Sequence, residues 1–105
     1  MKKELISSLY ERWKQYRKTM PKTSEIDAFI HLIIEEDARK KLSDIARALS
    51  EESIVREVHI VTGECDLILK VRAKDFDELS NFITKKLREY AWVKKTTTLL
   101  VLESI

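Results

Sequence analysis

The chain contains one glycine, Gly63, and one proline, Pro21, in 105 residues. These two residue types most often interrupt helices and strands, so their scarcity leaves little room for long irregular loops. Proline has no backbone N–H and ends a helix, whereas glycine takes up the positive φ of a tight turn without strain. We therefore expect nearly continuous secondary structure that is interrupted at these two positions.

The segment before Pro21 is predicted to form a basic amphipathic helix. Its apolar residues between Lys2 and Lys18 recur at spacings of three and four, which is the period of one helical face. Residues 1–23 carry seven Lys or Arg against two Glu. We divide the chain into this helix with its linker, 1–23, and one domain, 24–105. The simplest role of the helix is packing within an oligomer, and a phosphate contact or a docked partner are alternatives.

The second region alternates between strand and helix patterns. Strands are predicted at Ile26–Ile34, Ile54–Thr62, Cys65–Ala73 and Val93–Leu102. Helices are predicted from Glu36 through Leu49, and from a capping pair, Asp75 with Glu78, to about Tyr90. The order β-α-β-β-α-β with right-handed connections gives an α+β, ferredoxin-like fold: a four-stranded antiparallel sheet with both helices on one face.

Two features of the predicted sheet bear on function. Only Gly63 and Glu64 separate the second and third strands, which predicts a two-residue hairpin turn. The first strand is apolar on both sides, with Phe29 and Ile33 on the side opposite Ile30. One of those sides would meet water in a monomer, so we expect it to pack on a second copy or under the first helix, and self-association is the favoured outcome.

The composition argues against several classes of protein. The chain has no secretory signal pattern, and no segment approaches the roughly 18 to 20 apolar residues that span a bilayer, so a cytoplasmic protein without membrane contact is expected. Cys65 is the only cysteine, which excludes an internal disulfide. His31 and His59 have no further ligands at metal spacing, and there is no glycine-rich phosphate loop. We therefore predict no metal, no cofactor and no catalytic residues.

Two stretches carry a resemblance to a known family. The hairpin reads HIVTGECDLILKVRAKDFDELSNFI and the last strand reads VKKTTTLLVL. Val-Thr-Gly-x-x-Asp, Val-Arg-Ala-x-Asp, a helix opening with Glu-Leu and Val-x-x-Thr-x-Thr together resemble the effector-binding (RAM) domain of the Lrp/AsnC, or feast/famine, transcription regulators. The resemblance runs from about Ile26 to Glu103.

This resemblance implies a homodimer of the dimeric α+β barrel type, joined through the sheet, that often assembles into tetramers or octamers. It also implies an effector, an amino acid or related metabolite, bound at contacts between dimers. The family's helix-turn-helix domain needs roughly 50 residues, and about 25 precede the resemblance here. We expect a stand-alone effector domain without sequence-specific DNA binding of its own, and full-length Lrp/AsnC regulators are a further expected partner through mixed assembly.

The candidate ligand-binding residues fall into a turn group and a strand group. They are Thr62, Gly63, Glu64 and Asp66 in the turn, and Thr96 and Thr98 in the last strand. Asp66 suits the ammonium group of an effector, and its structural alternative is a capped turn or a salt bridge with a neighbouring Lys or Arg. Gly63 needs no ligand to explain it, and threonine runs are common in strands.

The predicted function is therefore sensing of an amino acid or related metabolite by an oligomerising module linked to transcription regulation. Two alternatives remain open. One is a small enzyme of the dimeric α+β barrel type, for which His31 and His59 are the groups that titrate near neutral pH. The other is an architectural scaffold that binds its partners through the basic helices.

Overall fold

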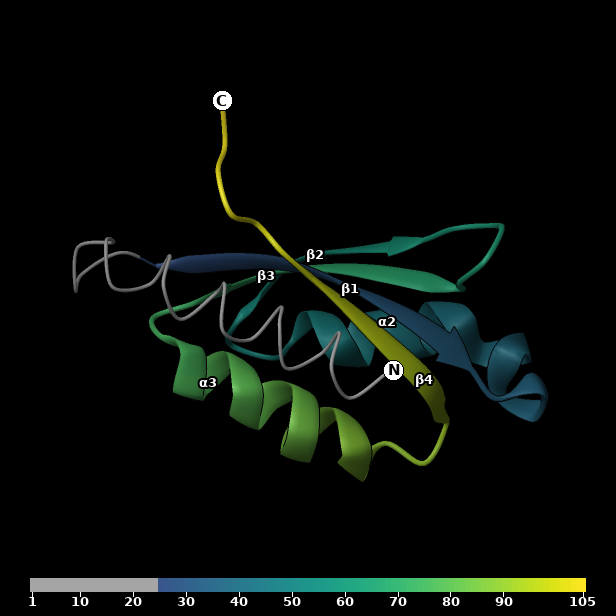
Figure 1. The fold of residues 1–105 in the computed structure, drawn as a ribbon. Helices are drawn as coiled ribbons and strands as arrows, with labels where there is room; N and C mark the ends of the chain where they lie inside the picture. The colour runs from purple at the N-terminus through teal and green to yellow at the C-terminus, as the bar shows by residue number, and fades with distance from the viewer. Residues whose placement is uncertain (1–24) are drawn as a thin grey trace, which may run out of the picture.

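The computed structural model describes residues 25–105, and the helix predicted over residues 1–23 lies outside this described part. The order of elements is β1 (Ile26–Ile34), η1 (Glu36–Lys41), α2 (Leu42–Ser50), β2 (Val55–Ile60), β3 (Leu67–Ala73), α3 (Phe76–Asn81), η2 (Phe82–Lys86), η3 (Leu87–Glu89) and β4 (Val93–Leu100). The predicted order β-α-β-β-α-β is confirmed. The helices lie together on one side of the sheet (Figure 1).

The four strands form one antiparallel sheet in the order β2-β3-β1-β4. The strands that are neighbours in sequence at the hairpin, β2 and β3, also pair with each other, whereas β1 lies in the centre between β3 and β4. This is the predicted ferredoxin-like arrangement. It leaves β2 and β4 as edge strands, so one backbone edge of each is open.

The core lies between the sheet and the helices. Alternate residues of the two central strands are fully buried: Ile30, Leu32, Ile34, Leu67, Leu69 and Val71 have no exposed surface. The helices contribute Ile45, Leu49, Leu79, Phe82 and Leu87. A strand places successive side chains on opposite faces, so this strict alternation buries one face and leaves the other open.

The second helical segment begins at the predicted cap. The Asp75 carboxylate accepts a hydrogen bond from the Glu78 N–H at 2.8 Å, and the Glu78 carboxylate accepts one from the Lys74 N–H at 3.1 Å. The first bond satisfies an N–H that the first helical turn leaves without a partner, and the second holds the residue before the cap. The segment runs through α3, η2 and η3 to Glu89, in agreement with the predicted end near Tyr90.

The predicted two-residue turn at Gly63 and Glu64 is wrong. β2 ends at Ile60 and β3 begins at Leu67, and the last hairpin hydrogen bond runs from the Val61 N–H to the Asp66 carbonyl at 3.0 Å. The loop therefore contains four residues, 62–65. Gly63 has a φ of 117°, so the expected positive φ is present although the turn is longer.

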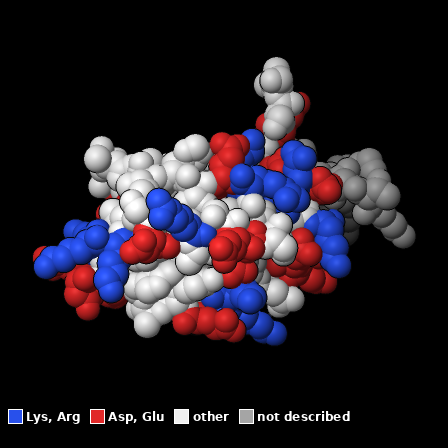
Figure 2. Space-filling model, turned by 180° about the vertical axis from the view of Figure 1, so that it is seen from behind, with Lys and Arg blue, Asp and Glu red and all other residues white. Residues whose placement is uncertain are grey.

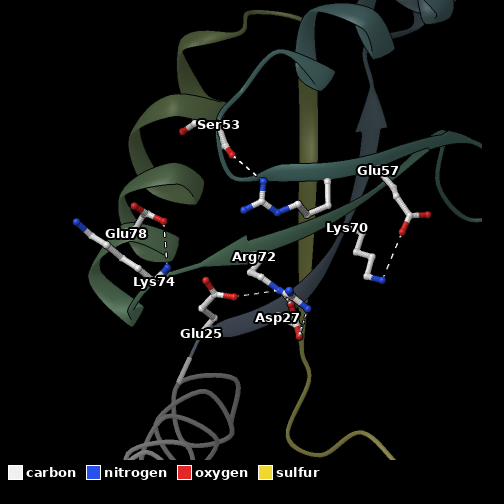
Figure 3. Close-up of polar contacts among 9 residues, drawn as sticks. Glu25, Asp27, Ser53, Glu57, Lys70, Arg72, Lys74 and Glu78 are labelled. Carbon is white, nitrogen blue, oxygen red and sulfur yellow. Dashed lines mark hydrogen bonds and ion pairs between the residues drawn. The ribbon is translucent and has the colours of Figure 1, made fainter. Parts of the chain in front are cut away.

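The face of the sheet opposite the helices, which we call the open face, carries a partly apolar centre. Phe29 of β1 pairs with Leu99 of β4, and their exposed fractions are 36% and 49%. Beside them the charged residues are already paired: Arg72 contacts Asp27 at 2.8 Å and Glu25 at 3.4 Å (Figure 3). The second pair, Lys70 with Glu57, is separated by 3.4 Å (Figure 3). This face is thus apolar in the middle, and the charges of Arg72 and Lys70 at its border are paired, whereas Lys95, opposite Ile33 on the same face, is in none of these ion pairs.

The two ends of the described domain meet at one place. The Val101 N–H, directly after β4, donates a hydrogen bond to the carbonyl of Asp27, near the start of β1, at 3.0 Å. From there residues 101–105 leave the sheet on the side away from the helices (Figure 1). Entry and exit of the chain are therefore neighbours.

Candidate functional site

The β2–β3 turn is an exposed loop held at its base. Thr62, Gly63 and Glu64 are exposed, whereas Cys65 and Asp66 are half-buried. A Cβ added at Gly63 would meet no atom within 4 Å, so space does not require a glycine there. The positive φ does, because a side chain in that conformation is strained. The turn therefore presents open backbone at a fixed geometry.

Asp66 ties this turn to the end of β1. Its carboxylate accepts a hydrogen bond from the Ile34 N–H at 2.8 Å, and its own N–H donates to the Leu32 carbonyl at 2.9 Å. The side chain is 20% exposed. The structural role considered for Asp66, capping of a backbone group, is therefore present, and the exposed fraction leaves part of the carboxylate accessible to a ligand.

A cation from η1 stands beside this carboxylate. The Nε atom of Arg39 lies 3.6 Å from Asp66 Oδ2, and the Arg39 side chain is 49% exposed. An ion pair this open to water is worth little, about 0 to 1 kcal/mol, so a ligand can displace or share it at small cost. No spacing in the sequence pointed to Arg39, because the sheet brings η1 and the hairpin together only in the folded chain.

The thiol next to Asp66 is deactivated. Partial burial raises the pKa of the Cys65 thiol above its usual value, and the negative charges of Asp66 and Glu64 raise it further. A higher pKa means less thiolate at neutral pH, and the thiolate is the reactive form. Cys65 thus has the opposite environment to that of a catalytic cysteine.

We expect Cys65 to react with iodoacetamide at pH 7.5 at least about threefold more slowly in the folded chain than in the urea-unfolded chain, because the raised pKa lowers the thiolate fraction. The rate is measured by mass spectrometry of timed samples. As the only cysteine, Cys65 reports on the turn alone. Faster alkylation of the folded chain would contradict this environment and favour the enzyme alternative.

The strand group of candidates lies on another part of the sheet. Thr96 pairs with Leu32 and Thr98 with Ile30, so both threonines lie on the helix side of β4. Thr98 lines a hollow of about 200 Å³ against α3, and Thr96 lines a larger one of about 480 Å³. The prediction that both threonines share one face agrees with this register.

Within one chain the turn group and the strand group do not form a single site. Thr96, Leu32 and Leu67 lie in one row across β4, β1 and β3, so β1 separates the two groups. Two strand spacings amount to about 10 Å. A ligand of amino-acid size can contact both groups only where one of them comes from a second copy of the chain. Otherwise the two groups bind different ligands.

The two histidines lie in one row of the open face. His31 of β1 and His59 of β2 both pair with Ile68 of β3. His59 hydrogen-bonds to Glu57 at 3.0 Å, and this bond is the largest cause, ahead of Lys70, of the lowered pKa of the Glu57 carboxyl. No group of three or more His, Cys, Asp or Glu in residues 25–105 is arranged to hold a metal ion.

The comparisons with known proteins agree with this geometry. The family model described as the Lrp/AsnC ligand binding domain matches residues 27–105. An HTH-type transcriptional regulator of Pyrococcus abyssi is 35% identical over 78 residues, which cover 74% of this chain and 52% of that protein. A crystal structure of a Thermus thermophilus protein is 32% identical with a TM-score of 0.67, covering 76% of this chain and 96% of that one.

A third match is a ligand complex. The structure of a Neisseria meningitidis transcriptional regulator with L-Met is 27% identical with a TM-score of 0.65, and the match covers 76% of this chain and 51% of that one. The chain spans about half the length of the curated relatives it matches. Within the described residues, no helix is long and apolar enough to cross a membrane.

Proposed function

Because the chain belongs to the Lrp/AsnC ligand-binding domain family, we propose that it is an effector-binding module that senses an amino acid or related metabolite and assembles with copies of itself. The observation that carries the proposal is the Asp66 carboxylate, partly exposed beside the open backbone of the Gly63 turn. Thr62 and Glu64 of the turn are exposed around it. The described groups favour binding over catalysis, since Cys65 is deactivated.

The chemistry of the turn suits a zwitterion. The Asp66 carboxylate offers an acceptor to an ammonium group, and the Arg39 guanidinium, 3.6 Å away, offers donors to a carboxylate. A free α-amino acid carries both charges on adjacent groups. The Neisseria meningitidis regulator, half of which is similar to this chain, was solved in complex with L-Met, a ligand of this class.

The surface of the open face supports the proposal of self-association. Phe29 and Leu99 expose apolar area at its centre, while the neighbouring carboxylates and cations already neutralise one another. Two identical copies can therefore bury the apolar centre, and the paired charges of Arg72 and Lys70 add little like-charge repulsion. The same surface on a full-length regulator of the family would permit mixed assembly.

The scaffold alternative places binding on the basic helix predicted over residues 1–23, which lies outside the described residues, and the described surface gives it little support of its own. Figure 2 shows Lys and Arg interspersed with Asp and Glu over the face in view, with no broad area of positive charge. Residues 25–105 carry 13 Lys or Arg against 16 Asp or Glu. A phosphate backbone is held by concentrated positive charge, which this face lacks.

Thermal-shift measurements of the full chain against the twenty amino acids at millimolar concentration test the proposal. A ligand that binds the native state at a hundredfold excess over Kd stabilises it by about 2.7 kcal/mol. For the best ligand, Asp66→Asn is expected to weaken binding about tenfold or more, because the amide oxygen still accepts the Ile34 N–H while the charge is lost.

The matched control is Asp44→Asn, which removes one exposed carboxylate from the first turn of α2. It changes the net charge equally but leaves the turn intact, so amino-acid binding should be unchanged. A panel in which no amino acid or related metabolite stabilises the chain would overturn sensing. A ligand that binds Asp66→Asn as tightly as the unmodified chain would overturn this assignment of the site.

A further inference from the structure

The hollow that Thr96 lines is on the far side of β1 from the turn, and its lining is rich in positive charge. It has a volume of about 480 Å³ and lies between the end of the α3–η3 helical segment and the start of β4. Its lining includes three cations, Arg88, Lys94 and Lys95, and no carboxylate. Its volume lies in the range of about 300 to 1,000 Å³ typical of small-molecule sites.

The positive charge of this hollow is not compensated by ion pairs. The ion pairs found among residues 25–105 use Arg39, His59, Lys70 and Arg72 as cations, and none uses the three that line the hollow. The same residues carry more acidic than basic side chains, 16 against 13. The concentration of charge is therefore a local feature and does not reflect a basic domain.

A backbone irregularity places one of these cations. In the β1–β4 ladder Ile33 lies opposite Lys95 and Ile34 lies opposite Val93, so Lys94 is an extra residue without a partner. Such a bulge changes the direction of its side chain and leaves backbone groups unpaired. Because β4 is an edge strand, the Lys94 side chain lies at the border of the sheet, beside the hollow that it lines.

The remaining walls of the hollow are apolar side chains and a tyrosine that is hydrogen-bonded elsewhere. Ile83 from the helical segment forms an apolar side, and the fully buried Leu87 lies behind it. The Tyr90 hydroxyl donates to the Glu52 carboxylate at 2.5 Å, and this hydrogen bond is the main cause that raises the pKa of Tyr90 to about 12. Tyr90 is therefore engaged elsewhere, and the Thr96 hydroxyl is the neutral donor left in the lining.

We propose that this hollow binds a small organic anion, with a carboxylate or phosphate group held by Arg88 and Lys94 and an apolar body against Ile83. The site is distinct from the proposed amino-acid site, because β1 lies between it and the turn that Asp66 anchors. A chain with both sites responds to two classes of metabolite.

Titration calorimetry of the full chain with four probes tests this assignment: phosphate, phenyl phosphate, acetate and benzoate. Each probe with a phenyl group should bind more tightly than its parent. The tighter of phenyl phosphate and benzoate identifies the preferred head group. Arg88→Gln with Lys94→Gln should weaken that probe about tenfold, which corresponds to about 1.4 kcal/mol.

The matched control is Lys40→Gln with Lys41→Gln, which removes two exposed cations of η1. It changes the net charge equally and should leave binding unchanged. Ile83→Ala should weaken phenyl phosphate but not phosphate, and its unfolding midpoint in urea confirms that the variant folds. Asp66→Asn should leave all four probes unaffected, which separates this site from the proposed amino-acid site.

Two results would overturn the proposal. One is the absence of binding by all four probes at millimolar concentration. The other is an equal loss of binding in the Arg88/Lys94 and the Lys40/Lys41 double variants. That result would mean that binding depends on the net charge of the chain and not on this hollow.

Discussion

Replacing Ile30 with alanine is expected to destabilise the domain by about 2 to 5 kcal/mol, the largest effect among the predictions. Ile30 is fully buried in the centre of β1, where it lies between Leu69 of β3 and Thr98 of β4. Removal of its side chain leaves a cavity under the helices that the packed sheet cannot close. Urea denaturation followed by circular dichroism measures the loss.

The adjacent position provides the control. Phe29 lies on the opposite face of the same strand and is 36% exposed, so Phe29→Ala should reduce the intrinsic stability of the fold by about 1 kcal/mol or less. Unfolding is measured at two protein concentrations, because any contribution from self-association depends on concentration whereas the Ile30 effect does not. Equal losses for both variants would contradict the assignment of the two faces.

The second large effect concerns assembly. Leu99→Asp should weaken self-association by at least about 100-fold in the dimer Kd, which corresponds to about 2.7 kcal/mol. In a two-fold interface each substitution occurs twice, and each places a charge in the apolar centre of the open face. Sedimentation velocity over a concentration series measures the change in Kd.

Ile60→Asp is the matched control for this variant. Ile60 has the same exposed fraction as Leu99, 49%, but it pairs with the buried Leu67 and therefore lies on the helix side of the edge strand β2. A charge there should leave the dimer intact. The proposal of an open-face interface is wrong if the two substitutions weaken association equally, or if neither does.

Most of the fold could be predicted from local patterns. The β-favouring run of β1 and the capping pair Asp75 and Glu78 each act over a few residues, and both predictions matched the structure. The hairpin turn was the exception. Gly63 indicated a positive φ correctly, but loop length depends on where the ladder stops, and the last hairpin bond joins Val61 to Asp66, outside the two residues that the sequence marked as the turn.

The candidate site was less accessible to sequence reasoning. Asp66 stood out as a carboxylate in an apolar strand, whereas its neighbour Arg39 is 27 positions away and has no motif. The bulge at Lys94 depends on the register of two strands that lie far apart in the sequence. Contacts of this kind arise only from the assembled sheet, so no spacing within one segment predicts them.

The neighbouring ends of the domain have an evolutionary consequence. Since the Val101 N–H bonds to the Asp27 carbonyl, a gene fusion at either end enters and leaves the sheet at the same corner. This domain can therefore be fused to an unrelated protein without disturbing the core of the domain. No linker has to cross the sheet. A single domain of this family can thus be reused beside different fused domains, and only the protein attached at that corner has to change.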